Sequence, residues 1–233
     1  MLAPQLVNAL SLGCVYALFA LGFTLMFGVL GVINLSHGAV FMVGAYAAEQ
    51  AAVHFAFPLW AALLFAFGFS GCLGLVIDLL VLRPLRARGA PHLIPMIATI
   101  GVGIILANTV QGIFGAQNIR FPVELVSDQA LTIGGVAVTA LELGIIFMSF
   151  ALMALLLLAL KKTQLGRALR AIAESPRAAY LLGINVEGLF FLTSFVAAGL
   201  GGVAGVLIGL YSNALFPLMG KTMLEKGIAV IIL

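Results

Sequence analysis

Long stretches without a charged residue restrict the fold of this chain more than any other feature of its sequence. The first charged residue is Glu49, and further uncharged stretches cover residues 50–77, 89–119, 143–160 and 188–220. Each reaches or exceeds the roughly 18 residues that a membrane-spanning helix needs. Charged residues make up 8% of the chain, compared with about 25% in soluble domains. Because a bilayer core holds no water to bond backbone groups, these stretches predict an all-α, polytopic integral membrane protein.

The pattern predicts six full transmembrane helices and the start of a seventh, all in one membrane domain over residues 1–233. We expect the full helices at residues 5–28, 38–57, 59–82, 92–115, 140–160 and 188–212, and the seventh from about residue 227. Thr139 and Glu142 form a capping-box pattern where the fifth helix begins. Just before it, residues 131–138 are typical of a small extracytoplasmic hairpin around Gly134 and Gly135.

Basic residues predict which loops face the cytoplasm. Arg83, Arg86 and Arg88 lie in one loop, and five Lys or Arg residues lie within positions 161–177, two helices later. The positive-inside rule places both loops on the cytoplasmic side. Asp78 is expected at the same boundary, as a paired or snorkelling charge.

The remaining charged segments are expected on the outer side. Residues 117–138 and 213–226 follow there from the alternation of spans, so Lys221 and Lys226 belong to an outer loop. Glu49 and His54 are expected near the outer boundary, with a role in the substrate path as the alternative. The side of the N-terminus stays open, since it depends on whether residues 29–37 cross the membrane.

A short helix is predicted inside the second basic loop, and its surface suggests a protein partner. Ser175 suits the N-cap, Pro176 the first helical position and Gly183 the left-handed stop. The apolar side chains between them have no bilayer to enter, so we expect the helix to dock into a groove on another protein. A helix lying flat on the bilayer surface is the alternative. The expected docking residues, within a loop over residues 161–187, are Ser175, Pro176, Arg177, Ala178, Ala179, Tyr180, Leu181 and Gly183.

Residues 28–38, GVLGVINLSHG, interrupt the apolar pattern and mark a candidate translocation path. Such a break is tolerated in a membrane only where it faces protein or a watery cavity; an ordinary tight loop is the alternative. Asn34 or Ser36 is expected to cap the next helix and leave the N–H groups of residues 36–39 free. With no Lys or Arg expected deep in the membrane, these N–H groups would receive an anion. The expected path residues here are Asn34, Ser36, His37 and Gly38.

Two further patterns concern the fourth and sixth expected helices. Thr99, Asn108 and Gln111 are candidate pore-lining residues, or they bond a neighbouring helix. Gly201, Gly205 and Gly209 recur every four residues and predict a close helix contact, with a hinge as the alternative.

The sequence shows no constellation typical of an enzyme. It has no HExxH, GxSxG or phosphate-loop pattern, and its three histidines are isolated. Cys14 and Cys72 both fall in apolar stretches and indicate neither a disulfide framework nor a metal site. We therefore expect a protein without catalytic residues, metal or cofactor of its own.

Two segments together resemble the permease subunits of branched-chain amino-acid ABC importers, specifically the H-type half-permease. They are GVINLSHGAVFMVGAY at residues 31–46 and GRALRAIAESPRAAYLLGINVE at residues 166–187. In the coupling loop of many ABC importer permeases, Glu-Ala-Ala is followed three residues later by Gly. Here Arg177 stands in place of the Glu, so an ion pair expected of that Glu does not carry over. The family also continues beyond a seventh helix, which predicts that this sequence is C-terminally incomplete.

The resemblance implies half of a transmembrane pathway for branched-chain amino acids in a bacterial or archaeal inner membrane. The implied partners are a second, similar permease, two cytoplasmic ATPases that use the ATP, and an extracytoplasmic binding protein; homodimers and heterodimers stay open. Urea and short amides are alternative substrates within the family. From a different class, a membrane subunit of an enzyme complex would need paired His or acidic residues within spans. A secondary transporter would show inverted repeats, and neither feature is clear in the sequence.

Overall fold

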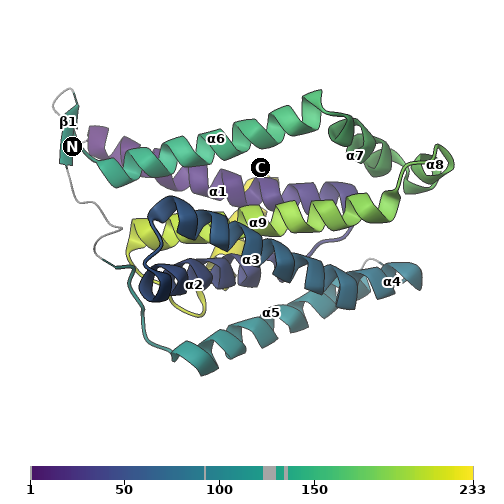
Figure 1. Ribbon diagram of the computed structural model, residues 1–233, viewed down its shortest axis with the longest axis horizontal. Coiled ribbons are helices and arrows are strands. Elements are labelled where there is room, and N and C mark those ends of the chain that lie inside the picture. The colour runs from purple at the N-terminus through teal and green to yellow at the C-terminus, as the bar shows by residue number, and fades with distance from the viewer. Residues whose placement is uncertain (1, 92, 123–129, 134–135, 233) are drawn as a thin grey trace.

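The computed structural model is a bundle of long helices with a two-stranded hairpin at one end (Figure 1). It describes residues 2–91, 93–122, 130–133 and 136–232. The hairpin pairs β1 (Ala130–Ile133) antiparallel with β2 (Val136–Thr139), as predicted, while Gly134 and Gly135 lie outside the described residues. The helices are α1 (Leu2–Leu30), α2 (His37–Phe55), α3 (Leu59–Ile77), a π-helical turn (Asp78–Leu82), α4 (Arg83–Ala87), α5 (Leu93–Phe114), α6 (Ala140–Lys162), α7 (Gln164–Glu174), α8 (Pro176–Leu181), α9 (Val186–Ser212) and α10 (Met219–Ile232).

The all-α membrane fold agrees with the sequence, but the number of long apolar helices differs from the expected six. Within the described part of the chain, five helical segments are long and apolar enough to cross a membrane: Gln5–Leu30, Leu59–Ala87, Leu93–Phe114, Ala140–Lys162 and Val186–Ser212. The helix α2 is not among them, because His37, Glu49, Gln50 and His54 lower its hydropathy. Its neighbours explain how these residues are tolerated, since most of α2 is buried inside the bundle.

The helix α9 forms the centre of the bundle, where it packs against α1, α2 and α3 (Figure 1). Its small residues permit this packing. Gly201 lies against the ring of His37, and a β-carbon at Gly205 would overlap the carbonyl oxygen of Phe41. Gly209 faces Leu215 in the segment that follows α9. The glycine stripe therefore lies in close contact with other parts of the same chain.

Both basic loops lie at the same end of the bundle. The helices α4, α7 and α8 gather there, and the hairpin and the N-terminal end of α1 lie at the opposite end (Figure 1). The basic end contains Arg83, Arg86, Arg88, Lys161, Lys162, Arg167, Arg170 and Arg177. By the positive-inside rule, this asymmetry predicts that the basic end faces the cytoplasm. The same rule predicts that the start of α1 lies on the outer side, a question that the sequence left open.

The helix α2 begins near the middle of the bundle, not at one of its ends. Its first residues contact the middle of three other helices: His37 packs against Phe19 of α1 and Gly201 of α9, and Ser36 lies beside Gly103 of α5. Residues 31–36 thus return the chain from the basic end to the middle of the bundle. From there α2 runs to the outer end, where α3 begins. The helix expected at residues 38–57 is therefore present, but it starts inside the bundle and is not among the five segments that are long and apolar enough to cross a membrane in the described part of the chain.

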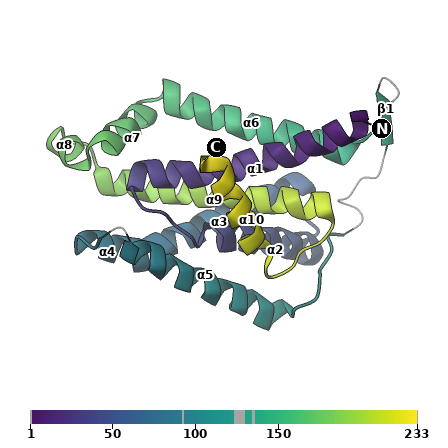
Figure 2. The same ribbon diagram turned by 180° about the vertical axis from the view of Figure 1, so that it is seen from behind.

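The last helix, α10, also begins near the middle of the bundle and crosses it at a steep angle (Figure 2). Gly220 near its start lies against the backbone of Gly38, and Gly227 lies against the ring of Phe19. An isolated β-bridge joins Ile119, in the loop after α5, to Leu215, in the loop between α9 and α10. Residues 213–218 therefore fold back inward from the outer end. The expected start near residue 227 is therefore too late, and Lys221 and Lys226 do not belong to an outer loop.

Candidate functional site

The break between α1 and α2 is held by hydrogen bonds within the chain. The Asn34 side-chain oxygen accepts from the backbone N–H of Ser36 at 3.0 Å and from its hydroxyl at 2.5 Å. The N–H of Leu35 donates to the Thr99 hydroxyl of α5 at 3.0 Å, and that hydroxyl donates to the carbonyl of Met96 at 2.8 Å. Asn34, Ser36 and Thr99 are all buried. The structure therefore brings three of the predicted path residues together, as supports of the break.

These bonds change the expected role of the backbone donors. The N–H groups of Ser36 and His37 both bond to Asn34, and the Ser36 side chain makes no capping bond to α2. The expectation of four free N–H groups at residues 36–39 is therefore wrong for the first two. Of residues 36–39, only Gly38 and Ala39 line the cleft between α2, α5 and α10 that is described below.

His37 occupies the aromatic core of the bundle. Its ring centroid lies 4.8 Å from that of Phe19 and 5.8 Å from that of Phe23. The side chain is buried, and its Nε2 has no hydrogen-bond partner among the described residues. His37 therefore packs α1, α2 and α9 together and does not line the cleft.

A cleft of about 380 Å³ opens between α2, α5 and α10. Its walls are mostly aliphatic, and Lys221 is the one charged residue among those that line it. Gly38 permits the close approach of α10, since a β-carbon there would lie 3.0 Å from the β-carbon of Leu224. The lining residues are Leu35, Gly38, Ala39, Met42, Ile100, Gly103, Ile104, Ala107, Pro217, Leu218, Gly220, Lys221 and Leu224.

The other two candidates on α5 lie beside this cleft on the exposed surface. Asn108 donates to the carbonyl of Ile104 at 2.8 Å, within its own helix. Gln111 is exposed and lies four residues after Ala107, so it continues the stripe of α5 that lines the cleft. Neither side chain bonds a neighbouring helix among the described residues.

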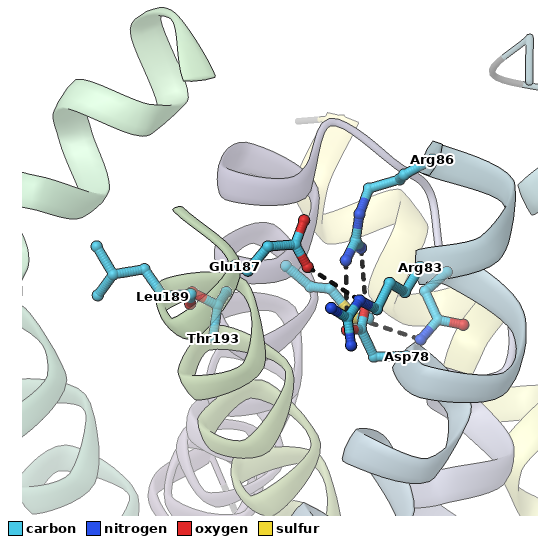
Figure 3. A network of polar contacts seen from close by, with 8 residues as sticks. Asp78, Arg83, Arg86, Glu187, Leu189 and Thr193 are labelled. Carbon is cyan, nitrogen blue, oxygen red and sulfur yellow. Dashed lines mark hydrogen bonds and ion pairs between the residues drawn. The ribbon is translucent and has the colours of Figure 1, made fainter. Parts of the chain in front are cut away.

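An ion-pair network fixes the cytoplasmic end of the bundle (Figure 3). Asp78 is fully buried and accepts from both terminal nitrogens of Arg86, at 2.7 and 3.3 Å. The Arg86 guanidinium also lies 4.6 Å from the ring centre of Phe190 in α9. Nearby, Arg83 pairs with Glu187 at 3.2 Å in a more exposed position. The expected pairing of Asp78 is confirmed, and both arginines tie the end of α3 to the start of α9.

The basic loop contains a helix that the sequence reasoning missed. In α7, the Thr163 hydroxyl caps the start by accepting from Gly166 at 3.0 Å, and Arg170 donates to the carbonyl of Leu160. Leu169 and Ile172 are buried against the bundle. A signal was present, because apolar residues at positions 165, 168, 169 and 172 follow helical spacing between basic ones.

The helix α8 presents an exposed apolar tip, formed by Tyr180, Leu181 and Leu182. Their exposed fractions are 71%, 81% and 80%. The ends of α8 agree with the sequence: the Ser175 hydroxyl accepts from Ala178 at 3.3 Å, and Gly183 adopts a φ of +81°. Ala179, in contrast, is only 1% exposed and packs into the chain's own core, which anchors the tip. Assigning Ala179 to a docking surface is therefore wrong. Arg177 and Ala178 are exposed beside the tip.

Comparison with known proteins places the chain in a family of transport proteins. Residues 5–233 match the family model described as "Branched-chain amino acid transport system / permease component". No solved structure gives a significant match.

Curated relatives match most of the chain. It is 35% identical over 227 residues to the high-affinity branched-chain amino acid transport system permease protein BraD of Pseudomonas aeruginosa, covering 93% of this chain and 73% of that protein. It is 33% identical over 229 residues to the corresponding protein LivH of Escherichia coli K12, with the same coverage. A probable branched-chain amino acid transport permease protein LivH of Methanocaldococcus jannaschii is 34% identical over 197 residues, covering 82% of this chain and 61% of the relative.

Proposed function

Since this chain belongs to the family of branched-chain amino acid transport system permease components, we propose that it forms half of a membrane pathway that imports branched-chain amino acids. The Pseudomonas and Escherichia relatives are high-affinity permease proteins of this kind. The chain itself is a multi-pass membrane protein. Its partners are a second permease subunit, two cytoplasmic ATPases and an extracytoplasmic binding protein, and ATP is used by the ATPases and not by this chain.

The exposed tip of α8 is the observation that carries the proposal. Three large apolar side chains lie together on a capped helix at the basic end of the bundle, where no bilayer core can cover them. A patch of this kind marks an interaction site. Because α8 packs against α7 and α9, and α7 packs against α1 and α6, a push on the tip reaches the transmembrane helices through packed contacts. This arrangement suits a surface that transmits movement from an ATPase to the pathway.

The exposed polar groups on α5 support a second permease subunit. Asn108 and Gln111 lie on the outer half of a span, next to the cleft, and neither is covered by the described part of this chain. Amide groups that face lipid lose hydrogen bonds to water, so such groups normally face protein or a water-filled path. A partner subunit against the exposed face of α5 supplies that cover.

The proposal is tested with Leu181→Asp in the complete transporter. We expect the variant to assemble in the membrane but to lose leucine uptake and leucine-stimulated ATP hydrolysis, since a carboxylate at the tip opposes burial in an ATPase groove. The matched control is Leu165→Asp, the same change at an exposed leucine on α7 at the same end of the bundle. The control should keep most of its uptake. Normal coupling by Leu181→Asp would contradict the proposed role of α8.

A substrate comparison tests the other half of the proposal. Vesicles that contain the wild-type transporter and its binding protein should accumulate labelled leucine, isoleucine and valine. Accumulation of urea or acetamide in preference to these amino acids would show that the substrate class is wrong.

A further inference from the structure

The helix α10 carries three charged residues beside the middle of the bundle. Lys221, Glu225 and Lys226 are all exposed on the surface of this chain, while Met219, Met223 and Gly227 face the bundle. This position follows from the neighbours, since Gly220 lies against Gly38 and Gly227 lies against the middle of α1. A Lys or Asp near the centre of a span costs about 2.5–3.5 kcal/mol when it faces lipid. The charged face of α10 must therefore meet water or polar groups.

The two lysines differ in what surrounds them. The Lys226 ammonium donates to the hydroxyl of Tyr16 at 3.1 Å and lies 5.4 Å from the centre of its ring. Lys221 has no ion-pair or hydrogen-bond partner for its side chain within the described residues, although Glu225 lies one helical turn away. Lys221 also lines the cleft between α2, α5 and α10, which Lys226 does not. A ligand in the cleft would therefore meet the ammonium of Lys221.

The other walls of the cleft suit the rest of such a ligand. Leu35, Ile100, Ile104 and Leu224 offer aliphatic surface, and the volume of about 380 Å³ falls in the range of about 300–1,000 Å³ that small-molecule sites occupy. An aliphatic wall beside a single cation is complementary to a molecule with a branched hydrocarbon group and a carboxylate.

We propose that this cleft receives the transported amino acid within the membrane, and that the Lys221 ammonium pairs with its carboxylate. The proposal rests on the proposed function, and it adds where in the chain the substrate binds. Lys221 thereby takes the place of the backbone N–H groups at residues 36–39, which the sequence suggested as the main partner of the anion. Two of those donors are already bonded to Asn34. The first turn of α2, at Gly38 and Ala39, forms the neighbouring wall.

The test measures leucine uptake by the complete transporter, reconstituted in proteoliposomes with its partner subunits and saturated binding protein. Lys221→Met should lower uptake about tenfold or more, the loss expected from one charge-assisted interaction. Lys221→Arg keeps the charge and should stay within about threefold of wild type. Lys226→Met is the matched control, since it removes a lysine from the same helix outside the cleft.

Chemical rescue keeps the test informative if Lys221→Met fails to assemble. Lys221→Cys is made in a background in which Cys14 and Cys72 are replaced by Ala, since both are free thiols. Aminoethyl methanethiosulfonate restores an ammonium at position 221, and methyl methanethiosulfonate adds only a neutral group. Uptake should return with the first reagent and not with the second.

The outcomes separate this inference from the proposed function. Equal leucine uptake by the wild type and Lys221→Met would overturn the assignment of Lys221 alone. Equal rescue by both reagents would do the same, because charge would then be irrelevant. If the thiol introduced by Lys221→Cys reacts with neither reagent, α10 lies against a partner subunit and the site is overturned. No leucine uptake by the wild type would instead refute the proposed function.

Discussion

The contact between α9 and α2 at Gly205 gives the sharpest prediction for stability. A β-carbon at Gly205 would overlap the carbonyl oxygen of Phe41 and would lie 2.9 Å from its carbonyl carbon and 3.5 Å from the β-carbon of Ala45. Carbon atoms pack best at about 3.5–4.0 Å. The obstacle is a backbone group within a helix, so it cannot rotate away as a side chain would. Gly205→Ala must therefore push α9 and α2 apart by about 1 Å.

The cost of this separation follows from typical values for packed cores. Overpacking a core costs about 1–3 kcal/mol, and the upper end applies here because neighbouring contacts also open. Alanine returns about 1 kcal/mol through its higher helix propensity. We expect Gly205→Ala to lower the free energy of unfolding by a net of about 2 kcal/mol. Since α2 belongs to the same chain, the loss falls on the fold itself before it affects assembly with partners.

The measurement is unfolding of the purified protein in mixed micelles by a denaturing detergent. Gly101→Ala is the matched control, because it changes a helical glycine of α5 with no atom within 4 Å of a new β-carbon. The control should gain up to about 1 kcal/mol from helix propensity alone. If Gly205→Ala proved as stable as Gly101→Ala, the close contact between α9 and α2 would be refuted.

Three further predictions concern the ion pairs and the break. Arg86→Met should lower the free energy of unfolding by about 3–5 kcal/mol, because it leaves the fully buried Asp78 unpaired. Arg83→Met breaks a more exposed pair and should lower it by no more than about 1 kcal/mol. Equal losses in the same denaturation assay would contradict the network. Thr99→Val should cost about 1–3 kcal/mol, because the partly buried N–H of Leu35 donates to the Thr99 hydroxyl and would lose this partner, and faster hydrogen exchange at residue 35 should report the loss. Gly38→Val should impair leucine uptake because its side chain would displace the start of α10, and unimpaired uptake would show that this contact does not shape the path.

Features that depend on neighbours along the chain could be predicted from the sequence. The capping box at Thr139 and Glu142 forms with the backbone N–H of Thr139 donating to the Glu142 carboxylate at 2.9 Å. The hairpin before it and both ends of α8 also appear where the residues indicated. Each of these relies on a few adjacent residues whose bonds form in any compact fold.

The candidate site could be predicted only in part. The break at residues 31–36 was located correctly, and Asn34, Ser36 and Thr99 do meet there. The position of Lys221 in the cleft could not be foreseen, since hydropathy places a segment with Lys221, Glu225 and Lys226 in a loop. That reasoning assumes that each segment meets lipid or water, and it fails where other helices supply the surroundings.

The sequence by itself determined that this chain is an all-α membrane protein with its basic residues gathered in two loops and a capped apolar helix in the second of them. These properties follow from local composition, because the bilayer sorts apolar from charged segments without reference to their neighbours. Only the tertiary structure decided that α2 begins inside the bundle, that α10 crosses it, and that Lys221 borders an apolar cleft. These depend on contacts between residues far apart in the chain, such as Gly38 with Gly220, and close packing of backbones at small residues decides which helices can form them.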